Sequence, residues 1–231
     1  MVTENLKIVE EKIVQACARS GRRRSDVTLI AVSKTKPAEM MIEAIESGIS
    51  VFGENKVQEM MEKQEILKEH EQLQWHMIGH LQRNKVRQLV GKTVRIHSVD
   101  SLRLASQIEA DFAKKEELAH ILVEVNMAKE DTKFGVLPEE TEELIRQIAK
   151  FPHVRVRGLM TIAPYVENSE QNRIHFRNLH KLLVDINRKN IDNISMDELS
   201  MGMTGDYEVA IEEGATFVRV GTGIFGNRQY T

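Results

Sequence analysis

Two lysines stand directly after an apolar run near the N-terminus. Residues 27–32 (VTLIAV) are almost wholly apolar and rich in β-branched side chains, which predicts a strand buried on both faces. Lys34 and Lys36 follow, and Pro37, which lacks an N–H to donate, ends the strand. If extended backbone continues this far, both lysine side chains point to the same side. Burial and the neighbouring positive charge of Lys36 would then lower the pKa of Lys34. The neutral amine is the form that attacks an aldehyde to make a Schiff base. The alternative is an ordinary solvated lysine at a strand end.

Two loops near the C-terminus offer small residues, hydroxyls and free backbone N–H groups. They are residues 199–206 (LSMGMTGD) and 219–226 (RVGTGIFG), and each follows a predicted strand. Loops of this kind bind phosphate in many barrel proteins. The candidates to contact a phosphate are Ser200, Gly202, Thr204, Gly221 and Thr222. The alternative is that the glycines only permit tight turns.

The elements that position these residues alternate between strand and helix patterns along the whole chain. The segments that contain the predicted strands, the last two together with the loops that follow them, are residues 27–32, 50–55, 74–80, 94–100, 119–127, 154–164, 194–206 and 216–226. Eight strands separated by helices predict a single (β/α)8 TIM barrel over residues 1–231, with an extra N-terminal helix over residues 4–19. An open doubly wound sheet is the alternative, and the missing Gly-x-Gly-x-x-Gly turn weakens it.

Composition excludes several classes of protein. The 231-residue chain has a formal net charge of −3 and a pI near 6.3, so we expect neither nucleic acid nor an anionic membrane as a partner. The single cysteine, Cys17, excludes an internal disulfide and suits a reducing compartment, and no stretch reaches membrane-spanning length. The histidines lack metal-ligand spacing. We therefore expect a cytoplasmic protein without a metal site.

Six motifs, taken together, carry a resemblance. They are AVSKTKP, FGENKVQE, WHMIGHLQRNK, GLMTIAP, LSMGMTGDYEVAIEEG and RVGTGIFG, in this order between residues 31 and 226, and the resemblance as a whole runs from about residue 6 to residue 226. A lysine together with a phosphate site suggests pyridoxal phosphate or a covalently held sugar phosphate. The motifs closely resemble the pyridoxal phosphate homeostasis protein family. This resemblance implies a relative of the alanine racemase N-terminal barrel, with pyridoxal 5'-phosphate (PLP) as its cofactor.

The resemblance also implies roles for individual residues. Lys34 matches the lysine that holds PLP as a Schiff base. Ser200, Gly221 and Thr222 match phosphate contacts, and Asn55 matches a residue that lines the other side of the cofactor. It implies no catalytic residue and no role for the histidine of IGHLQ.

Arg219 matches an arginine that faces the pyridine nitrogen of PLP. A guanidinium stays protonated and can only donate a hydrogen bond, so it requires an unprotonated ring. A neutral pyridine withdraws fewer electrons, which leaves carbanions beside the imine poorly stabilised. The alternative for Arg219 is a structural ion pair with Glu212 or Glu213.

These implications favour a non-catalytic, monomeric PLP carrier that buffers the cofactor or delivers it to apo PLP-dependent enzymes. The first alternative is an amino-acid racemase of low efficiency. Racemases that share the barrel take a tyrosine base from a separate domain, for which we expect no room after residue 231. Of Tyr165, Tyr207 and Tyr230, we expect none to serve as a base. The second alternative is an aldolase-like barrel for sugar phosphates.

Overall fold

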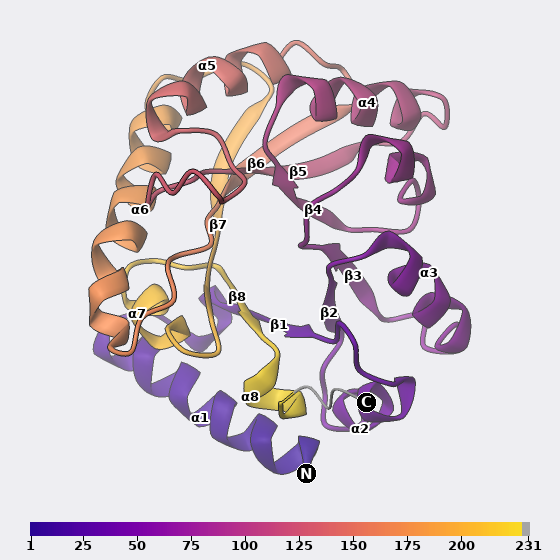
Figure 1. Cartoon of the computed structure of the whole chain (residues 1–231), viewed down its shortest axis with the longest axis vertical. Coiled ribbons are helices and arrows are strands. Elements are labelled where there is room, and N and C mark those ends of the chain that lie inside the picture. Colours follow the sequence, from indigo (N-terminus) through magenta and orange to yellow (C-terminus); the bar gives the residue numbers. More distant parts are fainter. Residues whose placement is uncertain (228–231) are drawn as a thin grey trace.

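The strands of the computed structural model close into a barrel. The structure describes residues 1–227, and within them eight parallel strands pair in chain order, with β8 returning to β1 (Figure 1). The strands are β1 (Thr28–Val32), β2 (Val51–Glu54), β3 (Gln74–Met77), β4 (Arg95–Val99), β5 (Ala119–Glu124), β6 (Val154–Met160), β7 (Ile194–Met203) and β8 (Phe217–Val220). The predicted (β/α)8 barrel is confirmed, and closure excludes the open sheet.

Helices surround the barrel and connect its strands. The α-helices are α1 (Val2–Arg19), α2 (Ala38–Glu46), α3 (Val57–Ile66), α4 (Leu102–Ala113), α5 (Pro138–Ile148), α6 (Arg173–Asn187), α7 (Tyr207–Glu212) and α8 (Thr222–Phe225). Three 3-10 helices also occur in residues 1–227: η1 (Arg24–Asp26), η2 (Arg83–Gln88) and η3 (Ser169–Asn172). The predicted extra helix is α1, which packs against α2, α7 and α8 (Figure 1). None of the helices in residues 1–227 combines the length and apolarity needed to cross a bilayer.

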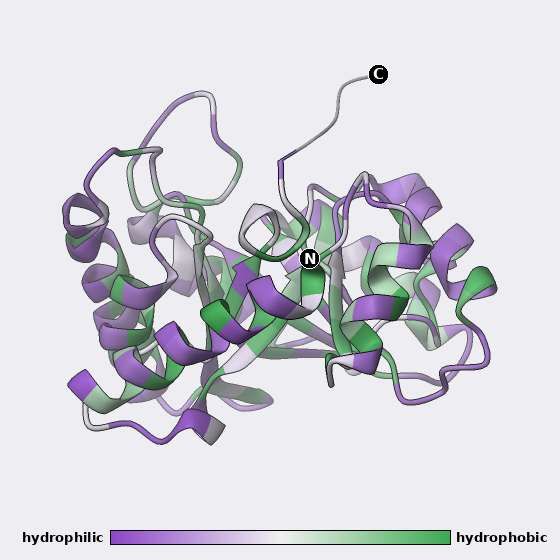
Figure 2. Ribbon diagram, turned by 90° about the horizontal axis from the view of Figure 1, so that it is seen from below, coloured by the Kyte–Doolittle hydropathy of each residue, from purple (hydrophilic) through white to green (hydrophobic). Residues whose placement is uncertain are grey.

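The main apolar core lies between the strands and the surrounding helices. Figure 2 shows predominantly hydrophobic strands at the centre of the molecule and helices that carry many hydrophilic positions. Phe52, Met60 and Phe176 are among the fully buried side chains of this core. Alternation along a strand sends every second side chain the other way, into the barrel.

The barrel interior is unusually polar. Barrels of this kind are filled mainly by branched aliphatic side chains. Here Arg95 of β4 donates from Nε and Nη2 to the carboxylate of Glu198 on β7, with a shortest N–O distance of 2.6 Å. His97 and Ser200 lie two residues further along the same strands and are fully buried. Inward positions on β4 and β7 therefore carry polar groups where aliphatic side chains are usual.

Candidate functional site

Lys34 and Lys36 do not share a side through strand alternation. Strand β1 ends at Val32, and residues 34 and 35 form a turn in which Thr35 has a φ of +61°. A left-handed conformation is unusual for a β-branched residue, and here a hydrogen bond from Thr35 N to Glu59 Oε1 holds it at 2.6 Å. The prediction of continued extended backbone was wrong because the chain turns directly after β1.

Lys36 is bound to the backbone of the C-terminal segment. Its ammonium donates to the carbonyls of Phe225, Gly226 and Asn227 at distances of 3.1, 2.9 and 3.0 Å, respectively. An ammonium group has three donors, and these three bonds use all of them. Lys36 therefore fastens the end of α8 to the segment that carries Lys34.

The loops that follow β7 and β8 touch each other. Thr204 Oγ1 accepts a hydrogen bond from Gly223 N at 3.3 Å, which joins the two segments. Gly202 has a φ of +89°, and a Cβ there would lie 2.5 Å from Ala210 Cβ, so only glycine fits. Gly221 lies beside the end of β1, since a Cβ on it would be 3.3 Å from the carbonyl oxygen of Val32. The predicted phosphate loops therefore meet at the end of β1.

Two residues of the predicted loops belong to strands instead. β7 continues to Met203 and β8 to Val220, so Ser200 and Arg219 are strand residues whose side chains point into the barrel. The fully buried Ser200 Oγ accepts from Arg219 Nη1 and bonds His97 Nδ1 at 2.8 Å. Its role as a phosphate contact stays a prediction, and these bonds do not favour it.

Arg219 is a buried cation near the carboxyl ends of the strands. Besides its bond to Ser200, it donates from Nη2 to the carbonyl of Thr161 at 2.8 Å. The predicted alternative of an ion pair with Glu212 or Glu213 was wrong, because those carboxylates pair with arginines of α1 and α6. Burial lowers the pKa of Arg219 to about 10, which still leaves it charged at neutral pH.

A buried ionic network that sequence reasoning missed supports the turn at Lys34. We call Ser33, Glu54, Glu59 and Lys63 the Lys63 network. Lys63 Nζ donates to the carbonyl of Ser33 at 2.6 Å, to Glu54 Oε1 at 2.6 Å and to Glu59 Oε1 at 2.7 Å. Ser33 Oγ also donates to Glu54 Oε1 at 2.6 Å. One signal of this network is visible in the sequence: an acidic residue, Glu54, at the end of an apolar strand.

Asn55 follows β2 at the same end of the barrel. Its backbone packs tightly on the next strand end, since a Cβ on Gly79 would lie 2.5 Å from the Asn55 carbonyl oxygen. Within residues 1–227 its side-chain amide has no hydrogen-bond partner, and it is partly exposed. Asn55 is thus available to a ligand at the barrel mouth, and its contact with a cofactor stays a prediction.

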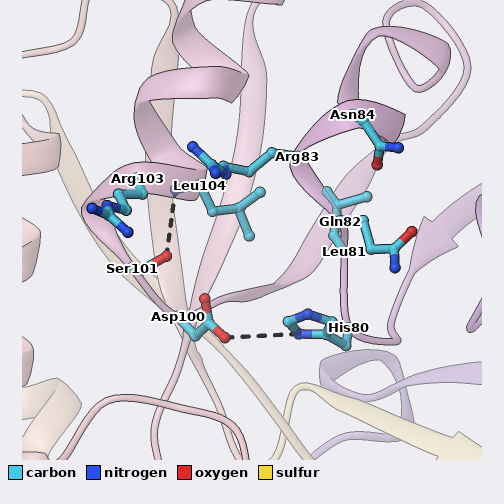
Figure 3. Close-up of a pocket in the computed structure, with 9 residues that line it drawn as sticks. All are labelled: His80, Leu81, Gln82, Arg83, Asn84, Asp100, Ser101, Arg103 and Leu104. Carbon is cyan, nitrogen blue, oxygen red and sulfur yellow. Dashed lines mark hydrogen bonds and ion pairs between the residues drawn. The ribbon is translucent and has the colours of Figure 1, made fainter.

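A separate pocket of about 490 Å³ opens beside this end of the barrel, after β3 and β4. His80 lines it, with its Nδ1 3.8 Å from Asp100 Oδ2 (Figure 3). The ring of His80 also stacks on Phe134, with centroids 4.0 Å apart. The residues that line this pocket include none of the six that are predicted to bind the cofactor. His80 thus belongs to a neighbouring surface rather than to the predicted site.

One carboxyl near the site has a strongly altered acidity. Burial, together with the nearby charge of Asp100, raises the pKa of Glu124 from 4.5 to about 7 against the opposing effect of Arg219. Between these two values the folded protein holds a proton on Glu124 that the unfolded chain releases. The contribution of Glu124 to the free energy of unfolding therefore falls as pH rises from 4.5 to 7.

We expect Glu124→Gln to remove this pH dependence. Urea unfolding of the cofactor-free protein at pH 5 to 8 measures it, with the unmodified chain as reference. Relative to that reference, the variant should gain stability on the order of 3 kcal/mol across the range. A difference that does not change with pH would show that Glu124 has its ordinary acidity.

Metal chemistry finds no support in the described part of the chain. Residues 1–227 contain no group of three or more His, Cys, Asp or Glu side chains that could hold a metal ion. The described residues instead bring three features together at the carboxyl ends of β1, β7 and β8. These are the turn that carries Lys34, the two loops that contain glycine and threonine, and the buried guanidinium of Arg219.

These features define the class of the protein, a barrel like the N-terminal domain of alanine racemases. The family model described as "Alanine racemase, N-terminal domain" matches residues 6–229. The chain is 47% identical over 227 residues to the pyridoxal phosphate homeostasis protein of Aquifex aeolicus, covering 98% of both chains. The chain belongs to the pyridoxal phosphate homeostasis protein family, which confirms the resemblance of the six motifs.

Solved structures agree with this assignment. A Bifidobacterium adolescentis protein described as unknown superposes with a TM-score of 0.92 at 34% identity, over 97% of this chain and 94% of that one. PipY of Synechococcus elongatus, solved with PLP bound, superposes with a TM-score of 0.83 at 34% identity. That match covers 98% of this chain and 100% of PipY. The fold and the family therefore rest on full-length similarity.

Proposed function

We propose that this protein binds PLP through an imine with Lys34 and takes part in PLP homeostasis by buffering or delivering the cofactor. The observation that carries the proposal is the pairing of β1 with β8, in which Ala31 lies opposite Val220. This pairing places the Lys34 turn, the loop that starts at Gly221 and the buried Arg219 around one end of the barrel. The names of the relatives and the PLP bound to PipY support the same ligand.

The residues fit the three polar ends of PLP. When bound, the cofactor supplies an aldehyde that an amine traps and a ring that withdraws electrons from the carbon beside the imine. Gly221, Thr222 and Thr204 offer backbone N–H groups and hydroxyls suited to a phosphate dianion. Arg219 offers a donor suited to the unprotonated ring nitrogen.

Arg219 also favours a carrier over a catalyst. Its guanidinium can only donate and cannot accept a hydrogen bond from a protonated ring nitrogen, so it favours a neutral ring, which is a weak electron sink. A second base is also poorly provided. Tyr165 is 97% exposed in the loop after β6, Tyr207 is buried with a pKa raised by that burial to about 12, and Tyr230 lies outside the described residues. We therefore propose that catalysis is not substantial.

The cellular setting follows from the same proposal. A free aldehyde reacts with amines, so a protein that holds PLP as an imine and passes it on would serve apo PLP-dependent enzymes. We propose that it acts as a monomer in the cytoplasm. Cys17 is buried and forms no disulfide within residues 1–227, which suits a reducing compartment.

The phosphate contacts predict a preference between two ligands. We expect pyridoxal to bind at least tenfold more weakly than PLP, since a hydrogen bond to a charged group contributes about 1.5–3 kcal/mol. Thr222→Val should weaken PLP by a comparable factor, because the isosteric side chain cannot donate. Pyridoxal is the internal control, and its affinity should not change in this variant. Equal affinities for both ligands, measured by absorbance titration, would contradict the phosphate assignment.

The carrier role predicts almost no chemistry on amino acids. With PLP bound, L-alanine in heavy water should show little cofactor-dependent exchange of its α-proton, which NMR follows directly. The reason is the neutral ring opposite Arg219. Exchange at ordinary enzyme rates, about 1–1000 per second, would instead establish the racemase alternative.

A further inference from the structure

Four buried polar side chains form a continuous hydrogen-bonded line inside the barrel. We call His76 of β3, His97 of β4, Ser200 of β7 and Arg219 of β8 the interior network. His76 Nδ1 lies 2.8 Å from His97 Nε2, and His97 Nδ1 lies 2.8 Å from Ser200 Oγ. Arg219 Nη1 donates to the same Ser200 oxygen, and none of the four residues is more than 4% exposed. The network therefore runs across the barrel and ends at the arginine of the proposed cofactor site.

The two histidines are held in place by packing as well as by hydrogen bonds. Phe217, two residues before Arg219 on β8, meets both imidazoles edge to face, with centroid distances of 5.4 Å to His76 and 5.5 Å to His97. Buried polar groups cost free energy unless they are paired. Neither histidine is needed by the binding groups proposed above, so their presence requires another explanation.

Both imidazoles are neutral at pH 7. Burial lowers the pKa of His76 to about 3, and burial also lowers the pKa of His97 well below its usual value. A neutral imidazole has one N–H donor and one acceptor nitrogen. His97 uses both of its nitrogens, so its two hydrogen bonds must run in the same direction along the network.

The direction follows from Arg219, which can only donate. Ser200 Oγ accepts from Arg219, and among residues 1–227 its own hydrogen has one further partner, His97 Nδ1. His97 then carries its proton on Nε2 and donates to His76 Nδ1. Every bond consequently points away from Arg219, and a lone pair of Ser200 faces the guanidinium.

We propose that His76 and His97 are positioning residues that keep the Ser200 oxygen turned toward Arg219 and so fix the guanidinium that faces the cofactor ring. The effect on the cofactor rests on the proposed function. The hydrogen-bond direction stands on the structure of the protein alone. Without an acceptor at His97, the Ser200 hydroxyl can turn its hydrogen toward Arg219. The Ser200 O–H and the Arg219 N–H are both donors, so the hydrogen bond between the two residues would be lost.

The direction is tested on the full chain without cofactor. Long-range ¹H–¹⁵N NMR spectra of the histidine-labelled protein at pH 7 identify which ring nitrogen of each imidazole carries the proton. We expect His97 and His76 both to be protonated at Nε2. A proton on Nδ1 of either ring would overturn the proposed direction, whether or not the protein binds PLP.

The positioning role is tested with two substitutions at one site. His97→Leu removes the acceptor, and we expect PLP affinity to fall about tenfold and the absorption band of the bound cofactor to shift. His97→Asn places an amide oxygen near the position of Nδ1 and should restore both. His120→Leu on β5 is the matched control, because its ring forms no hydrogen bond with the interior network. Unchanged affinity and spectrum in His97→Leu would overturn the role.

Further readouts keep the two proposals separate. If the unmodified protein fails to bind PLP, the proposed function fails while the NMR experiment still decides the hydrogen-bond direction. If His97→Leu does not fold, His76→Phe takes its place, since it removes the acceptor at the far end and keeps a ring against Phe217. We expect a smaller loss of affinity in the same direction. An unchanged affinity in that variant would count against the positioning role.

Discussion

Lys34→Ala abolishes the PLP adduct that borohydride fixes, whereas Lys36→Ala retains it: this is the largest effect that we expect on binding. The Lys36 ammonium makes three hydrogen bonds to backbone carbonyls, so we expect the amine of Lys34 to attack the aldehyde. Attack forms the imine and releases water, and reduction by borohydride makes the bond permanent. Mass spectrometry of the digested, reduced protein locates the label.

Lys36→Ala acts through the loop that it fastens. Loss of its bonds frees the end of α8 from the lysine-bearing segment, and we expect PLP affinity to fall roughly tenfold while the adduct persists. Thermal unfolding of both variants serves as the control for folding, since neither side chain belongs to the apolar core. A pyridoxyl group on Lys36 in the unmodified protein would reverse the assignment of the two lysines.

The fold could be predicted because the outward faces of the strands are apolar. Segments such as residues 119–127 alternate with amphipathic helices along the chain, and this pattern specifies a barrel with its functional loops at one end. The position of Lys34 after β1 and of Gly221 after β8 followed directly from it. In the structure both residues follow the strands after which they were predicted to lie.

The depth of the site could not be predicted in the same way. On β7 and β8 the inward side chains Glu198, Ser200 and Arg219 are polar, so the strand ends look like loops in the sequence. The interior network could not be predicted from the sequence, because its four residues lie on four different strands and come into contact only when the barrel closes. Lys63 was missed for a related reason: in a charged helix it resembles a solvated residue, and only packing turns it inward.

The largest effect on stability should come from Lys63→Met. The substitution leaves Glu54, which is fully buried, without its cationic partner. Removing one partner of a buried ion pair costs about 3–5 kcal/mol. Burial already raises the pKa of Glu54 against the opposing effect of Lys63, so the lone carboxyl takes up a proton and part of the cost is recovered at low pH. Urea unfolding at pH 8 measures the loss of stability, and the same measurement at pH 5 shows how much of it is recovered when Glu54 is protonated.

Lys68→Met is the matched control on the same segment. Lys68 pairs with Glu65 at 3.1 Å, but both side chains are more than 60% exposed. Exposed pairs contribute about 0–1 kcal/mol, so this variant should unfold almost as the parent does. A loss in Lys68→Met as large as that in Lys63→Met would mean that a general loss of positive charge, rather than burial, explains the effect.

A double variant separates the stability of the Lys63 network from its effect on the site. Lys63→Met with Glu54→Gln removes both buried charges, and much of the lost stability should return because no carboxylate remains unpaired. The hydrogen bond from Lys63 to the Ser33 carbonyl stays absent, and Glu59 loses its own cationic partner while it holds Thr35 in its left-handed conformation. The turn that carries Lys34 is then less restrained, so PLP affinity should remain low in a protein that is stable again. If affinity recovers together with stability, the network serves folding alone, and the position of Lys34 is set by the end of β1 without it.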